Sequence, residues 1–352
     1  MKRKWSFSTL ILVGLFLVIA TSVSAQKRPM TVAEIALYKG PDRQQILEEG
    51  AKKEGRLTFY TSGILKQAVR PVVDAFQKKY PFIKVEIWRA GSDTLIPRVL
   101  EEFKAGRHIL DVVESTQTTH MTIQKAGIPQ PFYSPNLAFI EEDAITKAKG
   151  EGALAAAFRE SGISVGYNTK LLTKDQLPKT YQDLLNPKWK GKMAIAGSDT
   201  GQNWMGTILV FYGEDFLKKL VEQKFDVHMV SARAVLDMVI NGEYILSPTI
   251  FDSHVINSKQ QGAPCDWIPI EPVHVNIGQI ALYKHSPSPH AAMLFIDFEL
   301  SKEGAEIHKE TGYSPTRKDV VGAKTYKKFY GARSLEEAIK WDELFSRLFL
   351  KK

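Results

Sequence analysis

The sequence predicts an α/β fold in two lobes, and three observations support this. The chain has 352 residues, which at roughly 150 residues per domain corresponds to about two compact units. Its composition, with 44% hydrophobic and 24% charged residues, excludes a disordered chain and a collagen-like repeat. Short strands alternate with amphipathic helices, and this alternation predicts a parallel, doubly wound sheet.

The first 25 residues form a separate segment, typical of a secretory signal peptide. Three basic residues at 2–4 precede an apolar run at 10–20, and small residues follow up to Ala25. Eleven apolar residues rise only about 16 Å as a helix, so a permanent membrane anchor is the weaker alternative. We therefore predict cleavage after Ala25, a mature chain that begins at Gln26, and a periplasmic location. No Cys follows the cleavage site, which excludes an acylated amino terminus.

The charge balance excludes a strongly basic binding surface. The chain has 47 Lys and Arg against 39 Asp and Glu, and loss of the first 25 residues removes three bases and no acids. The mature net charge is thus +5, and basic pairs such as Lys52-Lys53 stand beside acids on predicted helices. We expect no nucleic-acid partner, although a positive field favours an anionic small ligand. Cys265 is the single cysteine, so no intrachain disulfide can form.

The hydrophobic periodicity and the turn residues predict the elements of the amino-terminal half. Residues 56–61 alternate apolar and polar side chains, which indicates a strand, and Ser62-Gly63 ends it. Apolar residues from Val69 to Tyr80 recur at helical spacing, with Pro81 just past the end. The same reading predicts strands at 85–89 and 110–114, a helix at 94–104 and a further helix after Thr116.

A new series of alternating strands and helices follows a predicted strand at 163–168. We predict strands at 192–196, 244–247 and 275–283, with an extended segment at 267–270. Residues 197–201 read as a polar turn, and the next helix is predicted from Trp204. Further helices are predicted at 231–240, where Ser231 caps the start, and at 252–261, 290–300 and 334–349.

No catalytic or metal-binding constellation is visible. The eight His residues do not fall at zinc-ligand spacing, and no serine-hydrolase, phosphate-loop or dinucleotide motif is present. We therefore predict no enzyme activity, no metal site and no cofactor. Glu114 with Asp199 is the best acid and base pair that an enzyme on this scaffold could use.

Hydroxyl residues recur where strands end and helices begin. They are Thr61-Ser62, Ser115-Thr116 and Ser198-Asp199-Thr200. In open α/β sheets these edges line the ligand crevice, and helix amino ends suit carboxylate or phosphate groups. The alternative is that each hydroxyl only caps a helix.

Aromatic and basic side chains complete the candidate site. Tyr60, Trp204 and Phe251 are candidate cleft walls, with a place in the core as the alternative, and Arg233 is a candidate anion clamp or a solvated surface residue. The predicted ligand-binding residues are Tyr60, Ser62, Ser115, Thr116, Ser198, Thr200, Trp204, Arg233 and Phe251.

Several stretches together resemble the extracellular solute-binding proteins of ABC importers, in the branch that contains the ferric-iron binders. The stretches lie at 57–62, 76–81, 111–115, 166–170, 181–192 and 312–317. The resemblance implies a type II periplasmic-binding-protein fold with a ligand cleft between two α/β lobes joined by crossing strands. We place lobe 1 at 26–164 plus 275–320 and lobe 2 at 165–274 plus 321–352, which includes the final helix.

The resemblance also implies a function and a departure from the iron binders. It implies a monomer that closes around a small molecule and delivers it to a permease in the inner membrane. Iron binders of this branch carry adjacent tyrosines after the strand that corresponds to 244–247, whereas this chain has Ile250 and Phe251 nearby. We therefore expect an anionic or polar organic solute. The alternatives are a ferric-iron transport protein with a non-standard site, and a periplasmic enzyme or sensor subunit on the same fold.

Overall fold

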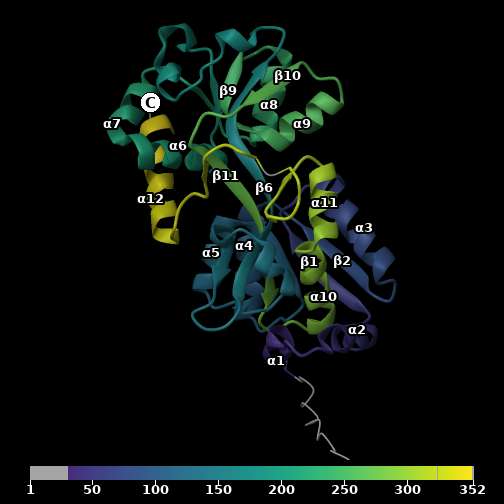
Figure 1. The fold of residues 1–352 in the computed structure, drawn as a ribbon. Coiled ribbons are helices and arrows are strands. Elements are labelled where there is room, and N and C mark those ends of the chain that lie inside the picture. Colours follow the sequence, from purple (N-terminus) through teal and green to yellow (C-terminus); the bar gives the residue numbers. More distant parts are fainter. Residues whose placement is uncertain (1–30, 323, 351–352) are drawn as a thin grey trace, which may run out of the picture.

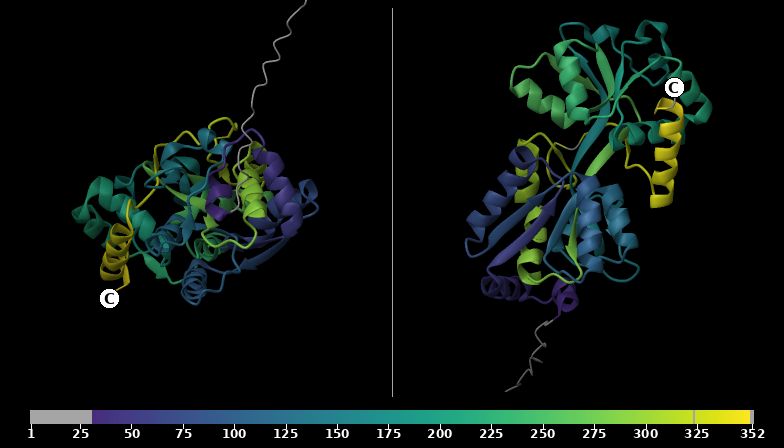
Figure 2. Two further views of the ribbon diagram at one scale, coloured as in Figure 1. Left: turned by 90° about the horizontal axis from the view of Figure 1, so that it is seen from below. Right: turned by 180° about the vertical axis from the view of Figure 1, so that it is seen from behind.

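The computed structural model describes residues 31–322 and 324–350, and the predicted signal peptide lies outside this range. Two lobes are visible, joined by the long strands β6 (Ala153–Asn168) and β11 (Val273–Tyr283) (Figure 1). The view from behind shows the same two strands running between the lobes (Figure 2). None of the helices in the described part of the chain combines the length and apolar character that a membrane span needs.

The first lobe contains the amino-terminal elements and two later helices. Its strands are β1 (Arg56–Thr61), β2 (Lys84–Arg89), β3 (Val112–Thr116), β4 (Pro129–Gln130) and β5 (Ile145–Lys147). Its helices are α1 (Val32–Leu37), α2 (Arg43–Glu54), α3 (Arg70–Lys79), α4 (Ser92–Lys104), α5 (Gln117–Lys125), α10 (Pro289–Glu299) and α11 (Lys302–Glu310). Phe59, Phe76 and Phe295 meet edge to face in its core, with ring centroids 4.8 and 5.0 Å apart.

The second lobe has its own core. Its strands are β7 (Ala194–Ala196), β8 (Asp226–His228), β9 (Leu246–Phe251) and β10 (Cys265–Ile268). Its helices are α6 (Asp199–Tyr212), α7 (Glu214–Val221), α8 (Ala232–Asn241), α9 (Asp252–Gln260) and α12 (Leu335–Phe345), which a π-helical turn at Ser346–Leu350 extends. Helix α12 packs on α6, where Gly206 leaves room for the ring of Trp341.

The sheet is mixed, which corrects the prediction of a purely parallel one. Strand β1 lies between β2 and β3 and is parallel to both, because a helix returns the chain between successive strands. Strand β11 is antiparallel to both β3 and β6. The reason is topological: β6 leads from the first lobe to the second and β11 leads back, so the two crossing strands run in opposite directions.

The last part of the chain covers the crossing strands before it reaches α12. Strand β12 (Ser314–Pro315) pairs with β6, and β13 (Lys328–Phe329) pairs with β11. Lys328 forms a buried ion pair with Glu160 of β6. Further along, Glu336 of α12 forms an exposed ion pair with Lys125 of α5 at 3.1 Å, so the last helix also contacts the first lobe.

Several boundaries differ from those predicted. Helix α6 begins at Asp199 rather than Trp204, and β9 covers Leu246–Phe251 rather than 244–247. Strand β6 begins ten residues earlier than predicted, at Ala153 instead of Ile163. Helices α7 and α11 were not predicted.

Candidate functional site

The registers show which strand ends lie where the lobes meet. Thr116, the last residue of β3, pairs with Gly278 near the middle of β11, whose earlier half continues toward the second lobe. Phe251, the last residue of β9, pairs with Ile163 of β6, close to the point where β6 leaves the first lobe. The carboxyl ends of β1 and β3 in one lobe and of β9 in the other therefore border the space between the lobes. Ligands of open α/β sheets bind at such edges.

Five hydroxyl side chains gather at this edge of the first lobe, and we call them the hydroxyl cluster. Its centre is Ser115, whose Oγ lies 2.9 Å from the Ser62 Oγ, 2.9 Å from the Thr119 Oγ1 and 3.3 Å from the Ser92 Oγ. Thr116 Oγ1 lies 3.2 Å from Thr119 Oγ1. Ser115 and Thr119 are buried, whereas Ser62, Ser92 and Thr116 are half-buried, so the cluster presents hydroxyl groups toward the space between the lobes.

The hydroxyls at the helix starts here do not act as caps. Thr116 is the N-cap residue of α5 and Ser198 that of α6, and neither side chain accepts a hydrogen bond from a backbone N–H of its own helix. By contrast, Ser231 accepts from the N–H of Ala234 and Ser301 from that of Gly304, as ordinary N-caps do. The capping alternative therefore fits Ser231 and Ser301 but not Thr116 or Ser198, whose helix amino ends keep their positive partial charge.

A pocket of about 310 Å³, partly open to solvent, lies between the lobes. Its walls come from the start of α5, from α6, from β11 and from the segment before α12. The lining residues are Thr116, Gln117, Thr118, Met121, Asn203, His274, Val275, Asn276, Ile277, Tyr330, Gly331 and Ala332. Since Thr116 belongs to both groups, the pocket adjoins the hydroxyl cluster.

The histidine in this pocket is neutral. His274 is buried and its Nδ1 lies 3.1 Å from Thr207 Oγ1. Burial lowers its pKa to about 3, because a charged imidazole loses its hydration there. The side chains that line this pocket are therefore uncharged at neutral pH, and hydroxyl, amide and imidazole groups supply its polarity.

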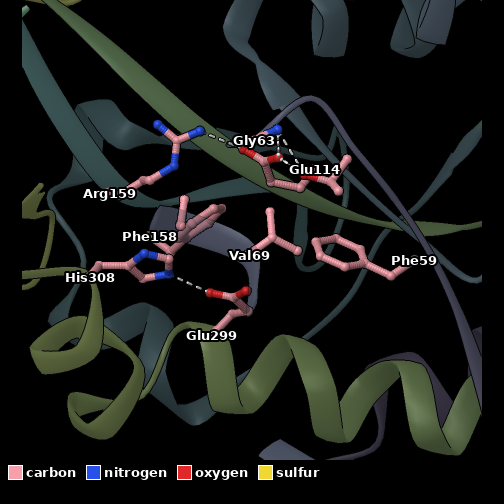
Figure 3. Close-up of a pocket in the computed structure, with 10 residues that line it drawn as sticks. Phe59, Gly63, Val69, Glu114, Phe158, Arg159, Glu299 and His308 are labelled. Atoms are coloured by element: carbon pink, nitrogen blue, oxygen red, sulfur yellow. Dashed lines mark hydrogen bonds and ion pairs between the residues drawn. The ribbon is translucent and has the colours of Figure 1, made fainter. Parts of the chain in front are cut away.

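Glu114 and Arg159 form a charged pair, which Figure 3 shows, and Glu114 points to the face of the sheet opposite Ser115, because successive residues of β3 alternate between the two faces. Arg159 Nη2 donates to Glu114 Oε1 at 2.7 Å. The second oxygen of Glu114 accepts from the Thr61 hydroxyl and, at 3.1 Å, from the N–H of Gly63. A cavity of about 200 Å³ beside them also reaches a buried pair of Glu299 and His308. Glu114, which the sequence suggested as a partner of Asp199 in acid and base chemistry, thus forms an ion pair with Arg159.

Two of the predicted aromatic residues lie in the cores. Tyr60 is 1% exposed, and its hydroxyl donates to the Glu102 carboxylate at 3.0 Å. Trp204 is also 1% exposed and packs edge to face on Phe225. Phe251 is half-buried at the end of β9.

The remaining predicted residues divide in the same way. Ser62, Ser115 and Thr116 come together in the hydroxyl cluster, and half-buried Ser198 stands at the start of α6 with buried Thr200 in its first turn. Arg233 is bound within its own lobe: it donates to Ser258 Oγ at 2.6 Å and to Asp237 Oδ1 at 2.8 Å.

Four residues of this region were missed. Gly91 precedes α4 and Ser92 begins it, shortly after β2 ends, which is the same strand-to-helix signal that identified the other hydroxyls, so Ser92 could have been found. Gln117 directly follows Thr116, and Asn276 is a polar residue inside an apolar strand, which is a weaker signal. Asn203 had no signal, because its role depends on where α6 begins.

The adjacent tyrosines of the iron binders have no counterpart at Ile250 and Phe251. No cluster of three metal-ligating His, Cys, Asp or Glu side chains occurs in the part of the chain that the structure describes. Ile250 is fully buried, and neither it nor Phe251 carries a phenol. The Tyr244 hydroxyl is bound to Asp226 and to His228, and burial together with Asp226 raises the pKa of Tyr244 to about 12. Positions 250 and 251 therefore supply no phenolate pair, and the Tyr244 phenol is already hydrogen-bonded.

The sequence of residues 72–330 matches the family model of bacterial extracellular solute-binding proteins. The chain belongs to this family. Its members are the solute-binding components of ABC transporters, which agrees with two lobes that border a polar pocket. The resemblance inferred from the sequence is confirmed, as is the two-lobed α/β fold.

Three similar proteins place this solute-binding protein among its relatives. It is 26% identical to an uncharacterised protein of Haemophilus influenzae over 75% of this chain and 78% of that one. It is also 26% identical to the major ferric iron-binding protein of Neisseria meningitidis, over 70% and 76% of the two chains. The structure of the periplasmic binding protein AfuA of Actinobacillus pleuropneumoniae, bound to fructose 6-phosphate, superposes with a TM-score of 0.67 and 23% identity. That match covers 85% of this chain and all of AfuA.

Proposed function

We propose that this solute-binding protein captures a small anionic or polar organic solute between its lobes and presents it to a membrane permease. The observation that carries the proposal is the hydroxyl cluster beside the interlobe pocket, with the uncapped amino ends of α4 and α5 next to it. Such groups donate hydrogen bonds to oxygen atoms of carboxylates, phosphates and sugars.

Relatives support two ligand classes, and the site favours one of them. The Neisseria protein is named for ferric iron, and AfuA was crystallised with fructose 6-phosphate. Ferric iron prefers phenolate ligands, and neither Ile250 nor Phe251 offers one. Hydroxyls and helix amino ends suit an oxygen-rich organic solute, so we favour that class for this chain.

We further propose that the protein acts in the periplasm as a monomer and has no enzyme activity. The basic start, the short apolar run and the small residues before Gln26 support export. The permease partner follows from the role that this family plays in ABC transport. Closure of the lobes would bury the solute and create the surface that the permease recognises.

Native mass spectrometry of the secreted protein, purified without unfolding, is the first test. A retained solute gives a mass increment that identifies its class. Calorimetry of Ser62→Ala, Thr116→Ala and Ser198→Ala then measures their part in binding. Each lost hydrogen bond to a charged group should cost about 1.5 to 3 kcal/mol, or roughly tenfold or more in affinity.

Ser301→Ala is the matched control. Ser301 caps α11 and accepts from Gly304 at 3.1 Å, but it contributes neither to the hydroxyl cluster nor to the pocket lining. Its loss should lower the free energy of unfolding by about 1 kcal/mol and leave affinity unchanged. Equal affinities in all four variants would remove the hydroxyl cluster from the site.

A further inference from the structure

We propose that Arg159 recognises an oxyanion group of the solute, a carboxylate or a phosphate, at the floor of the space between the lobes. This inference rests on the proposed function and narrows its ligand class. It also assigns the anion-binding role to the first lobe, whereas Arg233, the candidate from the sequence, is bound to Asp237 and Ser258.

The sheet register brings Arg159 next to the hydroxyl cluster. Gly278 of β11 pairs with Thr116 of β3 on one side and with Arg159 of β6 on the other. Directly opposed residues of neighbouring strands point to the same face of a sheet, so Arg159 and Thr116 flank Gly278 on one face. The register between β11 and β6 shifts after Gly278, which leaves Phe158 as an extra residue. Such bulges commonly redirect a side chain next to a binding site.

Gly278 provides the space that the guanidinium occupies. A Cβ added at this position would stand 2.6 Å from Cζ and 2.7 Å from Nε of Arg159. Any other residue would therefore displace the guanidinium. The glycine sits in a strand interior, where it weakens the sheet, so its presence fits the close approach of another group.

Glu114 holds the guanidinium without using most of its donors. Both Glu114 oxygens are engaged, one by Arg159 Nη2 and the other by Thr61 and Gly63. Among the residues that the structure describes, only Nη2 of the guanidinium has a hydrogen-bond partner, which leaves the donors of Nε and Nη1. The Tyr313 ring lies beneath, 4.6 Å from Cζ. The guanidinium is thus oriented from two sides.

The Arg159 side chain keeps some contact with solvent, whereas Glu114 is buried. The Arg159 side chain is 12% exposed, compared with 3% for Glu114. No nitrogen of its guanidinium is both fully buried and without a hydrogen-bond partner. Contacts also link it to the cluster: Glu114 accepts from Gly63, and the neighbouring Ser62 bonds to Ser115. An oxyanion between Arg159 and Thr116 would gain charge-assisted hydrogen bonds in a place that is largely shielded from water.

The test compares probes that differ in charge. Calorimetry and thermal unfolding are measured on the mature protein with inorganic phosphate, citrate and fructose 6-phosphate, and with fructose and putrescine as the neutral and cationic counterparts. We expect binding and stabilisation by at least one oxyanion and none by fructose or putrescine. Arg159→Met should weaken the oxyanion about tenfold or more, and Arg159→Lys less, because it keeps the charge.

Two further variants separate binding from folding. Gly278→Ala keeps Arg159 but pushes its guanidinium aside, so it should weaken the oxyanion as well. Arg159→Met/Glu114→Gln removes both charges and avoids leaving Glu114 buried without its partner. Arg43→Met is the matched control. It breaks another nearly buried pair of the same lobe, with Asp297 between α2 and α10, and should lower stability while affinity stays within about twofold.

Each outcome decides between the proposals. If fructose or putrescine binds and closes the lobes while no oxyanion does, the proposed function stands and the role of Arg159 is wrong. If oxyanions bind with equal affinity to the wild type, Arg159→Met and Gly278→Ala, the pair is structural. If no probe binds the wild type, the oxyanion inference fails. The solute retained in native mass spectrometry then decides whether the broader function fails with it.

Discussion

Removal of Lys328 should destabilise the crossing strands β6 and β11, because this residue neutralises a carboxylate that has no contact with solvent. Glu160 is 0% exposed on β6, and Lys328 of β13 pairs with it from the segment that covers the crossing strands. Loss of one partner of a buried pair costs about 3 to 5 kcal/mol. The Tyr330 hydroxyl still donates to the other oxygen of Glu160 at 3.3 Å, so we expect about 3 kcal/mol for Lys328→Met.

The loss should depend on pH in a defined direction. Burial raises the pKa of Glu160 above its ordinary 4.5, and Lys328 opposes that rise. Without Lys328 the pKa of Glu160 in the folded protein rises further. The variant is therefore most stable below the ordinary pKa of Glu, and it loses stability as the pH rises through the higher pKa of Glu160 in the folded protein. The variant should therefore approach the wild type near pH 4, below the ordinary pKa of Glu, and differ most near pH 7.

Circular dichroism melts at both pH values provide the assay. For lobes of this size, 3 kcal/mol corresponds to roughly 6 to 12 °C in Tm. Glu160→Gln/Lys328→Met, which removes both charges, is the control and should recover most of the loss. A loss of unfolding free energy below about 1 kcal/mol, as for a surface pair, would refute the placement of β13 over the crossing strands, and so would a loss that does not change with pH.

Three further predictions test other parts of the structure. Ferric citrate should produce no phenolate charge-transfer band, because Ile250 and Phe251 carry no phenol, and a strong band would reverse this. Gly206→Ala places a Cβ 2.1 Å from Cε3 of Trp341, so urea unfolding should show a loss of about 1 to 3 kcal/mol, and an unchanged midpoint would contradict the packing of α12 on α6. Amino-terminal analysis of the secreted protein should find Gln26 first, and recovery of the uncleaved chain would contradict export with cleavage.

Local signals were sufficient where they agreed with tertiary structure. Strand β1 was predicted at its observed bounds, because alternation and the following Ser62-Gly63 both marked them. Helix α8 was predicted from its two caps: Ser231 accepts from Ala234, and Gly242 adopts the left-handed conformation with φ of 84°.

Other elements were misplaced because long-range pairing overrode the local signal. Strand β9 continues through Pro248, which reads as a strand breaker. The pairing of β9 with β6 is irregular between Ser247 and Ile250, and proline is tolerated at such a bulge. Helix α6 begins at Asp199, within residues 197–201 that were predicted as a turn, and no side-chain cap at Ser198 marks this start.

The same distinction applies to the candidate site. Ser62, Ser115 and Thr116 could be identified because strand ends of one lobe converge at one sheet edge. Arg159 could not, since its environment depends on Glu114 and Gly278, which the fold brings to it from distant parts of the sequence. The core positions of Tyr60 and Trp204 could not be predicted, because an aromatic residue near a strand end or helix start can face either the cleft or the core.

Closure of the two lobes around a solute is the central claim, and small-angle X-ray scattering tests it most directly. The mature protein is measured alone and after addition of the solute that native mass spectrometry identifies. We expect the radius of gyration to fall on binding, and Thr116→Ala to require more solute for the same change. Saturated binding with an unchanged radius of gyration would contradict the claim, because the solute would then be held without closure of the lobes.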